Sequence, residues 1–245
     1  MSDLIDPERI ARELEQAGLG YVANLNPSIA RQLALWLDAL LDQPRNLTSV
    51  RTPQAAIAKH IIEPLVGRHR LIHADLPVPH GPMIDVGSGN GAPGLPFALC
   101  EPQRPATLLD SRSGAAAFLA STVARLEDVH IQVLGQRAEQ AARTELRDHF
   151  SLAVTRATAP PPIAMELLIP FLHIGGIAVL WTGEIREPAL EELSTAATEL
   201  GADLTMLDPP HDLVVATKLR STDDRFPRSW SQIRRRPLGL SHSGR

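Results

Sequence analysis

The segment 85–94, which reads Asp-Val-Gly-Ser-Gly-Asn-Gly-Ala-Pro-Gly, constrains the fold more than any other part of this chain. It ends an apolar run, 83–86, that predicts a strand, and it precedes an apolar stretch, 95–99, that predicts the start of a helix. Its glycines permit backbone conformations that a Cβ excludes, and they let bare main chain approach a ligand. The free N–H groups at the start of the following helix point at the same place. This order of elements predicts a nucleotide-binding turn.

A carboxylate at the end of the next apolar run indicates that the ligand contains a ribose. The run 106–110 ends in Asp110, and from Gly87 to Asp110 is 110 − 87 = 23 positions. That separation is close to the roughly 20 expected when a carboxylate on the second strand accepts hydrogen bonds from ribose hydroxyls. S-adenosylmethionine (SAM) and a nicotinamide dinucleotide both satisfy this pattern. Asp85 before the glycines and the Pro93-Gly94 pair after them favour SAM, and the nicotinamide cofactor stays the alternative.

Strand-like and helix-like patterns alternate after residue 82, which predicts an α/β domain. The expected strands are 83–86, 106–109, 130–134, 152–155, 176–181, 204–207 and 213–218. Only residues 208–212 join the last two strands, too few for a crossover helix, so these strands should pair antiparallel. We therefore expect a Rossmann-like, mostly parallel seven-stranded sheet with an antiparallel last strand, as in class I SAM-dependent methyltransferases.

Helical patterns precede this domain. The segments 7–17 and 27–41, and a third from residue 53 toward Pro64, show helical spacing of apolar residues behind capping residues. Prolines and a glycine between 77 and 82 mark the expected boundary between these helices and the α/β domain. The predicted organisation is an N-terminal helical extension (1–81), a SAM-binding methyltransferase domain (82–220) and a basic C-terminal segment (221–245).

Charge is distributed unevenly along the chain, whose net charge is −4. From Lys218 onward, eight Lys and Arg against two Asp give +6, and the remaining 16 bases and 26 acids give −10. The basic residues Arg228, Arg234, Arg235 and Arg236, with Phe226 and Trp230 among them, predict a segment that binds RNA phosphates and stacks on bases or sugars. The alternative is a solvated tail that balances an acidic body.

Other residues indicate the cellular compartment and whether a membrane or a metal ion is a partner. The single cysteine, Cys100, cannot form an internal disulfide and is expected in the core of a cytoplasmic protein. The first residues do not resemble an export signal, and Pro170 and two glycines interrupt the longest apolar tract, 167–181, so we expect no membrane partner. His69 and His73 share helical spacing, but no third ligand stands beside them, so no metal is predicted.

Residues that follow strands are the best candidates for the site, because ligands of open α/β sheets lie across the carboxyl ends of the strands. Arg156 comes directly after the fourth expected strand and is the candidate catalytic residue, through substrate positioning. Ala138 and Glu139 begin a helix after the third strand, where they could meet a purine edge. His60 stands on a helix among apolar residues and is expected to be a partly buried, hydrogen-bonded residue of the core.

Several short motifs, taken in order, resemble the RsmG (GidB) family of bacterial 16S ribosomal RNA methyltransferases, which methylate N7 of a guanosine. They are Asn46-Leu47-Thr48, Lys59-His60-Ile61-Ile62, Asp85 to Pro96, Leu109-Asp110-Ser111, Phe118-Leu119, Gly135-x-Arg137-Ala138-Glu139, Thr155-Arg156-Ala157, Gly175-Gly176, Phe226-Pro227-Arg228 and Pro237-Leu238. The resemblance implies SAM as methyl donor and 16S rRNA or the small ribosomal subunit as partner, with no membrane and no metal.

The resemblance also implies a set of cofactor-binding residues. The loop should contact SAM through Gly87 and Ala92, Asp110 should bind its ribose, and the adenine side should meet Ala138 and Glu139. Arg156 should lie in the reaction cleft and contact the cofactor as well. The predicted cofactor-binding set is Asp85, Gly87, Gly89, Gly91, Ala92, Asp110, Ala138, Glu139 and Arg156.

The chain departs from the family pattern where basic residues are common. Gly114 and Ala115 replace cations before Phe118, Thr182 replaces a lysine after the fifth strand, and Glu63-Pro64 replaces an Asp-Ser pair. Because phosphate contacts provide much of the affinity for RNA, the losses leave two alternatives open. One is a related methyltransferase redirected to another RNA or a small molecule. The other is a non-catalytic SAM- or RNA-binding factor in ribosome assembly.

Overall fold

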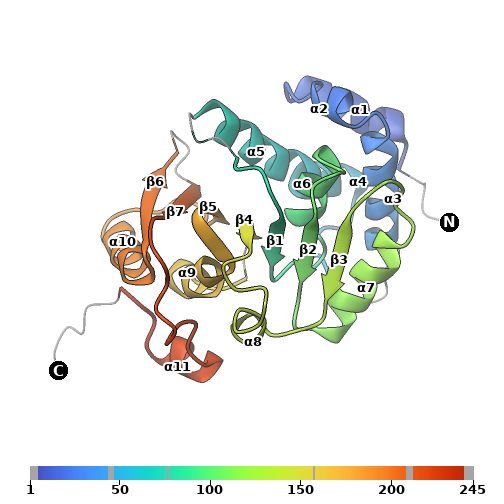
Figure 1. Cartoon of the computed structure of the whole chain (residues 1–245). Helices are drawn as coiled ribbons and strands as arrows, with labels where there is room; N and C mark the ends of the chain where they lie inside the picture. Colours follow the sequence, from blue (N-terminus) through green and yellow to red (C-terminus); the bar gives the residue numbers. More distant parts are fainter. Residues whose placement is uncertain are drawn as a thin grey trace.

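The computed structural model describes residues 5–43, 47–74, 76, 78–156, 158–207 and 212–239. Seven strands form one sheet in the order β3-β2-β1-β4-β5-β7-β6 (Figure 1). Their bounds are β1 Met83–Val86, β2 Ala106–Leu109, β3 Ile131–Leu134, β4 Phe150–Arg156, β5 Leu172–Trp181, β6 Ala202–Met206 and β7 Leu213–Lys218. The first five strands are parallel, and β7 runs antiparallel to both β5 and β6. The predicted fold class is confirmed.

Strand β7 lies between β5 and β6, so that β6 occupies the edge of the sheet. Several strand bounds differ from the expected ones, and β6, expected at 204–207, spans Ala202–Met206. Strand β5 begins at Leu172 rather than residue 176, since Leu172 pairs with Phe150 although Gly175 and Gly176 interrupt the apolar pattern. The turn expected at residues 208–211 lies outside the described residues.

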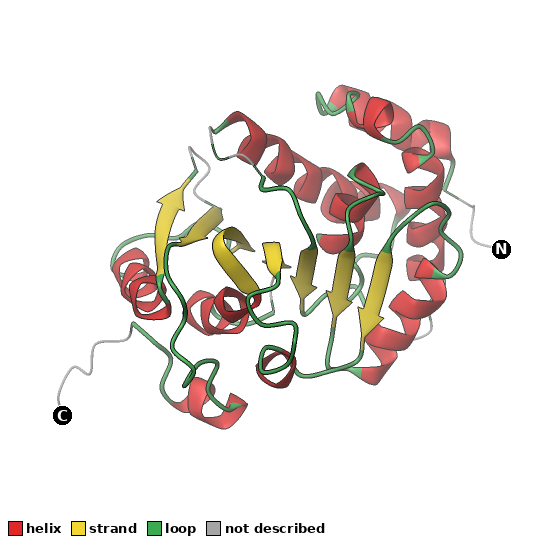
Figure 2. Ribbon diagram, in the orientation of Figure 1, coloured by secondary structure: helices red, strands yellow, loops and turns green. Residues whose placement is uncertain are grey.

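Helices cover both faces of the sheet (Figure 2). They are α1 Pro7–Gln16, α2 Val22–Leu25, α3 Ile29–Leu41, α4 Pro53–Ala56, the π-helical turn η1 Ile57–Ile62, α5 Glu63–His73, α6 Gly94–Cys100, α7 Ser113–Val123, α8 Ala138–Ala141, α9 Pro161–Leu168, η2 Ile169–Phe171, α10 Ala189–Leu200 and α11 Trp230–Arg235. Side chains of β1 alternate between the faces: Met83 packs in the core beneath α5 and α6, and Ile84 packs in the core beneath α9 and α10. No helix of the described ranges is long and apolar enough to cross a membrane.

The third N-terminal helix continues past the proline at which it was expected to stop. The turn η1 precedes Pro64, and the N–H of Glu63 donates to the carbonyl of Ala58, five residues back. Pro64 then falls in the first positions of α5, directly after η1. The carbonyl of Lys59, five residues before this proline, accepts from Arg156 instead of a helical N–H. The helix therefore reaches His73.

The N-terminal helices share a core with the sheet domain. Trp36 and Leu37 of α3 belong to the same buried cluster as Leu95 of α6 and Phe118 of α7. The Trp36 indole Nε1–H donates to the carbonyl of Asn90, at 2.8 Å, inside the glycine loop. The extension therefore supports the loop from outside the sheet.

The C-terminal segment packs on the other face. Phe226, Ile233 and Leu238 are buried in the cluster that contains α9 and α10. Arginines of the body, Arg143 and Arg147, donate to main-chain carbonyls between residues 222 and 227. The interpretation of this segment as a solvated tail is therefore wrong for residues 222–239.

Candidate active site

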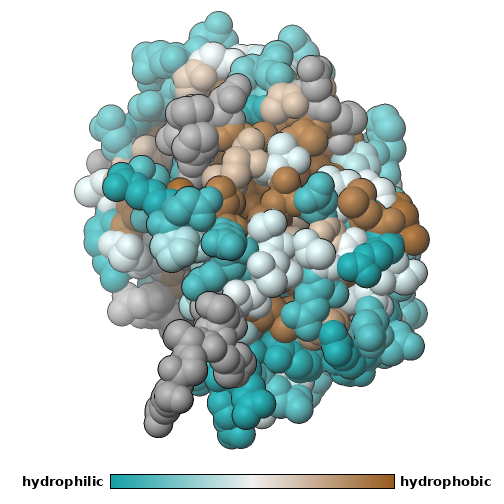
Figure 3. Space-filling model, turned by 90° about the vertical axis from the view of Figure 1, so that its left-hand side faces the viewer, coloured by the Kyte–Doolittle hydropathy of each residue, from teal (hydrophilic) through white to brown (hydrophobic). Residues whose placement is uncertain are grey.

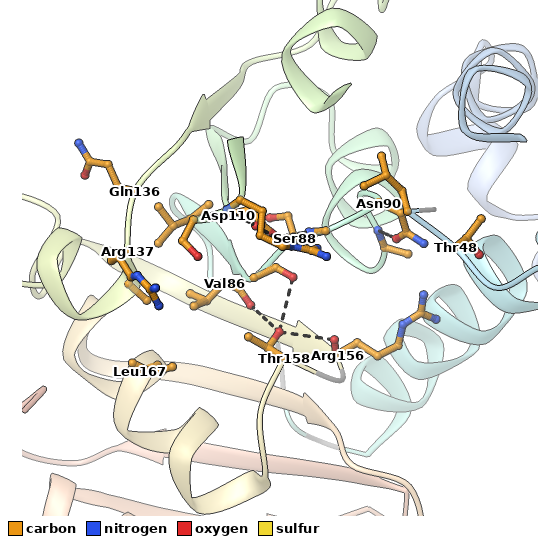
Figure 4. Close-up of a pocket in the computed structure, with 18 of the residues that line it drawn as sticks. Thr48, Val86, Ser88, Asn90, Asp110, Gln136, Arg137, Arg156, Thr158 and Leu167 are labelled. Carbon is orange, nitrogen blue, oxygen red and sulfur yellow. Dashed lines mark hydrogen bonds and ion pairs between the residues drawn. The ribbon is translucent and has the colours of Figure 1, made fainter. Parts of the chain in front are cut away.

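A cavity of about 540 Å³ lies at the carboxyl ends of the parallel strands. The residues that line it come from the glycine loop, the ends of β2 and β4, the start of α8, the turn η1, and α9 and α11. In Figure 4, Arg137 and Leu167 stand at one end and Thr48, Asn90 and Arg156 at the other, with Ser88 and Asp110 between them. The cavity thus lies at the edge of the sheet where the sequence predicts a ligand site.

The glycines of the loop have positive φ but different surroundings. Gly87 (φ 75°) and Gly89 (φ 57°) line the cavity, whereas Gly91 (φ 108°) does not. A Cβ on Gly87 would stand 2.4 Å from the Thr158 side chain, and one on Gly91 would stand 2.6 Å from Leu95. Gly87 and Gly89 therefore shape the cavity wall, while Gly91 allows the loop to pack on α6.

Asp85 lies beneath the loop, fully buried, and does not line the cavity. Its Oδ2 accepts a hydrogen bond from the N–H of Gly94, at 2.9 Å, where α6 begins. Burial raises the pKa of this carboxyl to about 7, although the Gly94 N–H and the charge of Arg156 oppose the shift. Asp85, which the sequence placed in the cofactor-binding set, therefore contacts the backbone of the loop rather than the cavity.

Asp110 lines the cavity with every lone pair of its carboxylate in use. Oδ1 accepts from the main-chain N–H and Nε of Arg112, at 2.8 and 3.2 Å. Oδ2 accepts from the N–H of Gly89 and the Nη2 of Arg112, at 2.8 and 3.2 Å. A carboxylate offers about four lone-pair positions. A ribose diol can therefore bind Asp110 only where the exposed partner, the Arg112 guanidinium, is displaced.

At the other end of the cavity, Ala138 and Glu139 lie where the sequence predicted an adenine side. Leu167 of α9 and Trp230 of α11 face the same space. Ala92 also lines the cavity, next to the loop glycines. These groups provide apolar walls and polar edges of the kind that enclose a nucleoside.

Arg156 and His60 form one hydrogen-bonded group. The Arg156 Nη1 donates to the carbonyl of Lys59 at 2.6 Å and to Glu63 at 3.3 Å, and its Nη2 donates to the His60 Nδ1 at 3.1 Å. A guanidinium has only donors, so Nδ1 carries the lone pair and the Nε2–H donates to the Thr48 hydroxyl at 2.9 Å. Burial, with the charges of Arg156 and Lys59, lowers the pKa of His60 to about 4.

Sequence reasoning assigned His60 to the core and missed it as a cavity residue. It is buried, as expected, but its ring edge faces the cavity because η1 turns it toward Arg156. The family-like Lys59-His60 motif was the available signal. The predicted positions Asn46 and Ala157 lie outside the described residues.

A second cavity of about 320 Å³ adjoins the first. The two cavities share Lys59, Arg156 and Thr158 as lining residues. The second is also lined by Trp181 at the end of β5, together with Thr182, the residue that replaces a family lysine. Arg156 thus lines both cavities.

The predicted RNA-binding arginines divide into two groups. Arg228 donates to both carboxylate oxygens of Glu166, which is fully buried, at 2.6 to 3.2 Å. Arg234, Arg235 and Arg236 are exposed on and after α11. Seen from the side of β6 and α10, the lower part of the surface, at the level of α11, is largely hydrophilic (Figure 3).

The site fits SAM. The two glycines at 87 and 89 form a cradle that a Cβ would fill, and Asp110 stands beside it with a carboxylate that can accept from a ribose diol once the Arg112 guanidinium is displaced. Within the described parts of the chain, no group of three His, Cys, Asp or Glu side chains could hold a metal ion. His69 and His73 pack ring against ring, with centroids 4.2 Å apart.

Comparison with known proteins matches residues 30–210 to the GidB family, rRNA small subunit methyltransferase G. Curated relatives carry the name ribosomal RNA small subunit methyltransferase G. The relative from Thermotoga neapolitana is 33% identical over 83% of this chain and 89% of its own length. The relative from Deinococcus deserti is 34% identical over 79% of this chain and 81% of its own.

Among solved structures, a 16S rRNA N2 methyltransferase of T. thermophilus, bound to AdoMet and guanosine, is similar with a TM-score of 0.45 and 17% identity. The similarity covers 63% of this chain and 39% of that one. The family match confirms the predicted resemblance, and with it the predicted enzyme class and methyl donor. The chain belongs to the rRNA small subunit methyltransferase G (GidB) family.

Proposed function

We propose that this protein transfers the methyl group of SAM to N7 of a guanosine in 16S rRNA, as free RNA or within the small ribosomal subunit. The observation that carries the proposal is the joint cavity, in which the glycine cradle and Asp110 open onto the same space as Arg156 and His60. Such a substrate places the protein in the cytoplasm, the compartment that its single cysteine favours.

The proposed reaction requires alignment rather than proton removal. Guanine N7 carries a lone pair and no proton, and the sulfonium of SAM supplies the methyl group when bound. Alignment of two reactants contributes on the order of 7–11 kcal/mol to a barrier reduction in favourable systems. His60 suits this chemistry because both of its ring nitrogens are engaged in hydrogen bonds and it stays neutral at physiological pH.

The proposed roles follow the two ends of the cleft. Gly87, Gly89, Ala92, Asp110, Ala138 and Glu139 hold the cofactor, and Asp85 and Gly91 hold the loop in shape. The second cavity, beside Trp181 and Thr182, receives the guanine. Arg156 positions the substrate between them, since it touches both spaces. The predicted division into 1–81, 82–220 and 221–245 stays part of the proposal, with the first part supplying His60 and Thr48 to the cleft.

Methylation of purified RNA tests the proposal. Small subunits and extracted 16S rRNA from cells that lack this protein are incubated with the full chain and SAM, and modified nucleosides are mapped by mass spectrometry. We expect one new 7-methylguanosine. Transfer to a different RNA or a small molecule would support the redirected methyltransferase, and SAM binding with no transfer would support an assembly factor.

Arg156 variants test its positioning role. Arg156→Ala should reduce kcat/KM for methylation severely and leave the affinity for SAM within a few-fold. Arg156→Lys should restore little, because an ammonium cannot span Lys59, Glu63 and His60 as the guanidinium does. Methylation that is unchanged in Arg156→Ala would remove this residue from the mechanism.

RNA binding is tested with point variants, because removal of the whole segment would expose the buried side chains of Phe226 and Ile233. The double variant Arg235→Gln, Arg236→Gln should weaken RNA binding and reduce the salt dependence of log K by about 0.7 per lost contact on single strands. A salt dependence that does not change would exclude this pair from the RNA surface.

A further inference from the structure

Trp230, the first residue of α11, lines the cofactor cavity. It is half-buried and packs against the core cluster that includes Leu167. Leu167 and Ala138 line the same cavity, and in Figure 4 Leu167 stands at one end of it, beside Arg137. An aromatic ring from the C-terminal segment therefore forms part of the wall of the cavity that the glycine loop and Asp110 also line.

The position of this indole is set by contacts on both sides of it in the chain. Before it, Phe226 is buried and Arg228 binds the buried carboxylate of Glu166 through four hydrogen bonds. At the helix start, Ser229 and Gln232 form a capping box. After it, Ile233 is buried in the same core. Trp230 is therefore presented to the cavity by a rigid support.

The surroundings of the ring select a planar, uncharged ligand group. The guanidinium carbon of Arg137 lies 6.0 Å from the Trp230 ring centroid, and that of Arg234 lies 5.9 Å from it. Such contacts attract a cation to the ring face. Arg137 is also a cavity residue, next to Ala138 and Glu139. An indole that lines the cavity together with Leu167 and Ala138 suits stacking with a purine.

We propose that Trp230 forms the adenine-facing wall of the cofactor cavity, so that the C-terminal segment binds the methyl donor as well as RNA. This inference rests on the proposed use of SAM in this cavity. It assigns to the cofactor an aromatic residue that the sequence pattern associated with RNA. One short helix then carries the adenine wall on its cavity side and the exposed Arg235 near its end, directly before the exposed Arg236.

Calorimetric titration of the full chain with S-adenosylhomocysteine and with adenosine tests the assignment. Trp230→Ala should weaken the binding of both by about 5- to 100-fold, the range found when an aromatic partner of a base is removed. Trp230→Phe should stay within about 3-fold, because a stacking face is kept. Ser231→Ala, an exposed change in the same helix, is the matched control and should not alter either affinity.

Fluorescence gives a second readout that does not depend on activity. The chain has three tryptophans, Trp36, Trp181 and Trp230. Addition of S-adenosylhomocysteine should change the emission of the unmodified protein and of Trp181→Phe, and this change should be lost in Trp230→Phe. The Phe variant keeps the test valid if Trp230→Ala does not fold.

Two results would overturn the inference. One is an unchanged affinity for S-adenosylhomocysteine in folded Trp230→Ala, with RNA binding reduced instead. That result would assign the indole to RNA binding and not to the cofactor. The other is a ligand-induced emission change that survives in Trp230→Phe. A failure of the unmodified protein to bind S-adenosylhomocysteine would count against the proposed function itself, which separates the two conclusions.

Discussion

The glycine loop, residues 85–94, and the C-terminal segment, residues 222–239, both reach the cavity, but different contacts hold them in place. The carboxylate contacts that shape the loop come from near neighbours in sequence, since Asp85 binds Gly94 nine residues on and Gly89 binds Asp110 twenty-one residues on, and Trp36 adds one remote hydrogen bond. The segment depends on partners 62 to 84 residues away, among them Glu166 and Arg143. The conformation of a local motif can be predicted from the sequence, whereas the position of a segment held by remote ion pairs cannot.

The largest effect on stability is expected when the ion pair between Arg228 and Glu166, which holds the C-terminal segment, is broken. Arg228→Ala leaves the fully buried Glu166 carboxylate without its charged partner, which should lower the free energy of unfolding by about 3–5 kcal/mol. Urea denaturation measures the loss. The double variant Glu166→Gln, Arg228→Met removes both charges and should cost much less. If the single and double variants were equally destabilised, the ion pair would not be what holds the segment.

A change in the conformation of the glycine loop should mainly affect the binding of the cofactor. Gly87→Ala adds a Cβ 2.4 Å from Thr158 at a φ of 75°, a combination of left-handed strain and overpacking worth roughly 2–5 kcal/mol. The affinity for S-adenosylhomocysteine should fall by at least about 30-fold in calorimetry, since 1.4 kcal/mol corresponds to tenfold.

The matched control for that change is Gly18→Ala. Gly18 has a similar φ, 71°, but open space around the added Cβ, so this change should leave ligand affinity unaltered. Adding Thr158→Ala to Gly87→Ala should restore part of the affinity by removing the contact while the strain stays. An equal loss in the single and double variants would show that strain alone acts at this position.

The pH dependence of stability should differ in sign between Asp85, in the loop, and His60, which the N-terminal helices supply. The pKa of His60 falls from 6.5 to about 4, so its contribution to stability is complete above pH 6.5 and is lost as the pH falls toward 4. The pKa of Asp85 rises from 3.8 to about 7, so its contribution is complete below pH 3.8 and is lost as the pH rises toward 7. The two dependences oppose each other.

Single variants should therefore show opposite slopes between pH 4 and 6.5. His60→Gln should lose stability as the pH rises, relative to the unmodified protein, and Asp85→Asn should gain it. At 1.36 kcal/mol per pKa unit, the difference attributable to either group is about 3 kcal/mol at most. Denaturant unfolding at several pH values measures it, and parallel curves for the two variants would contradict the assignment of either group.

The smallest effect is expected at Asp110, the carboxylate proposed to bind the ribose. Arg112→Leu removes a side chain that is 63% exposed and occupies two acceptor positions of Asp110. Exposed ion pairs contribute about 0.2–1 kcal/mol, so the affinity for S-adenosylhomocysteine should rise by up to about 5-fold. Arg31→Leu breaks an exposed ion pair with Glu127 elsewhere and should leave the affinity unchanged. A weaker affinity in Arg112→Leu would show that Arg112 assists the ligand instead of competing with it.

Local patterns in the sequence were enough to predict the sheet, the glycine loop and Asp110. Alternating apolar runs, positive-φ glycines and a carboxylate at a strand end each express a short-range rule of backbone geometry, and these rules hold wherever the segment lies. For the same reason the order of elements predicted the antiparallel β7, since a short connection cannot contain a crossover helix.

Only the tertiary structure decided which side chains from distant segments meet. His60 reaches Arg156, 96 residues away, because η1 turns it toward the end of β4, and no spacing rule encodes that approach. Arg228, which the sequence predicted as an RNA contact, is the partner of Glu166, and Trp230 lines the cavity, because burial of Phe226 and Ile233 brings the segment against α9. The free energy of such contacts depends on packing between remote parts of the chain, which local sequence does not describe.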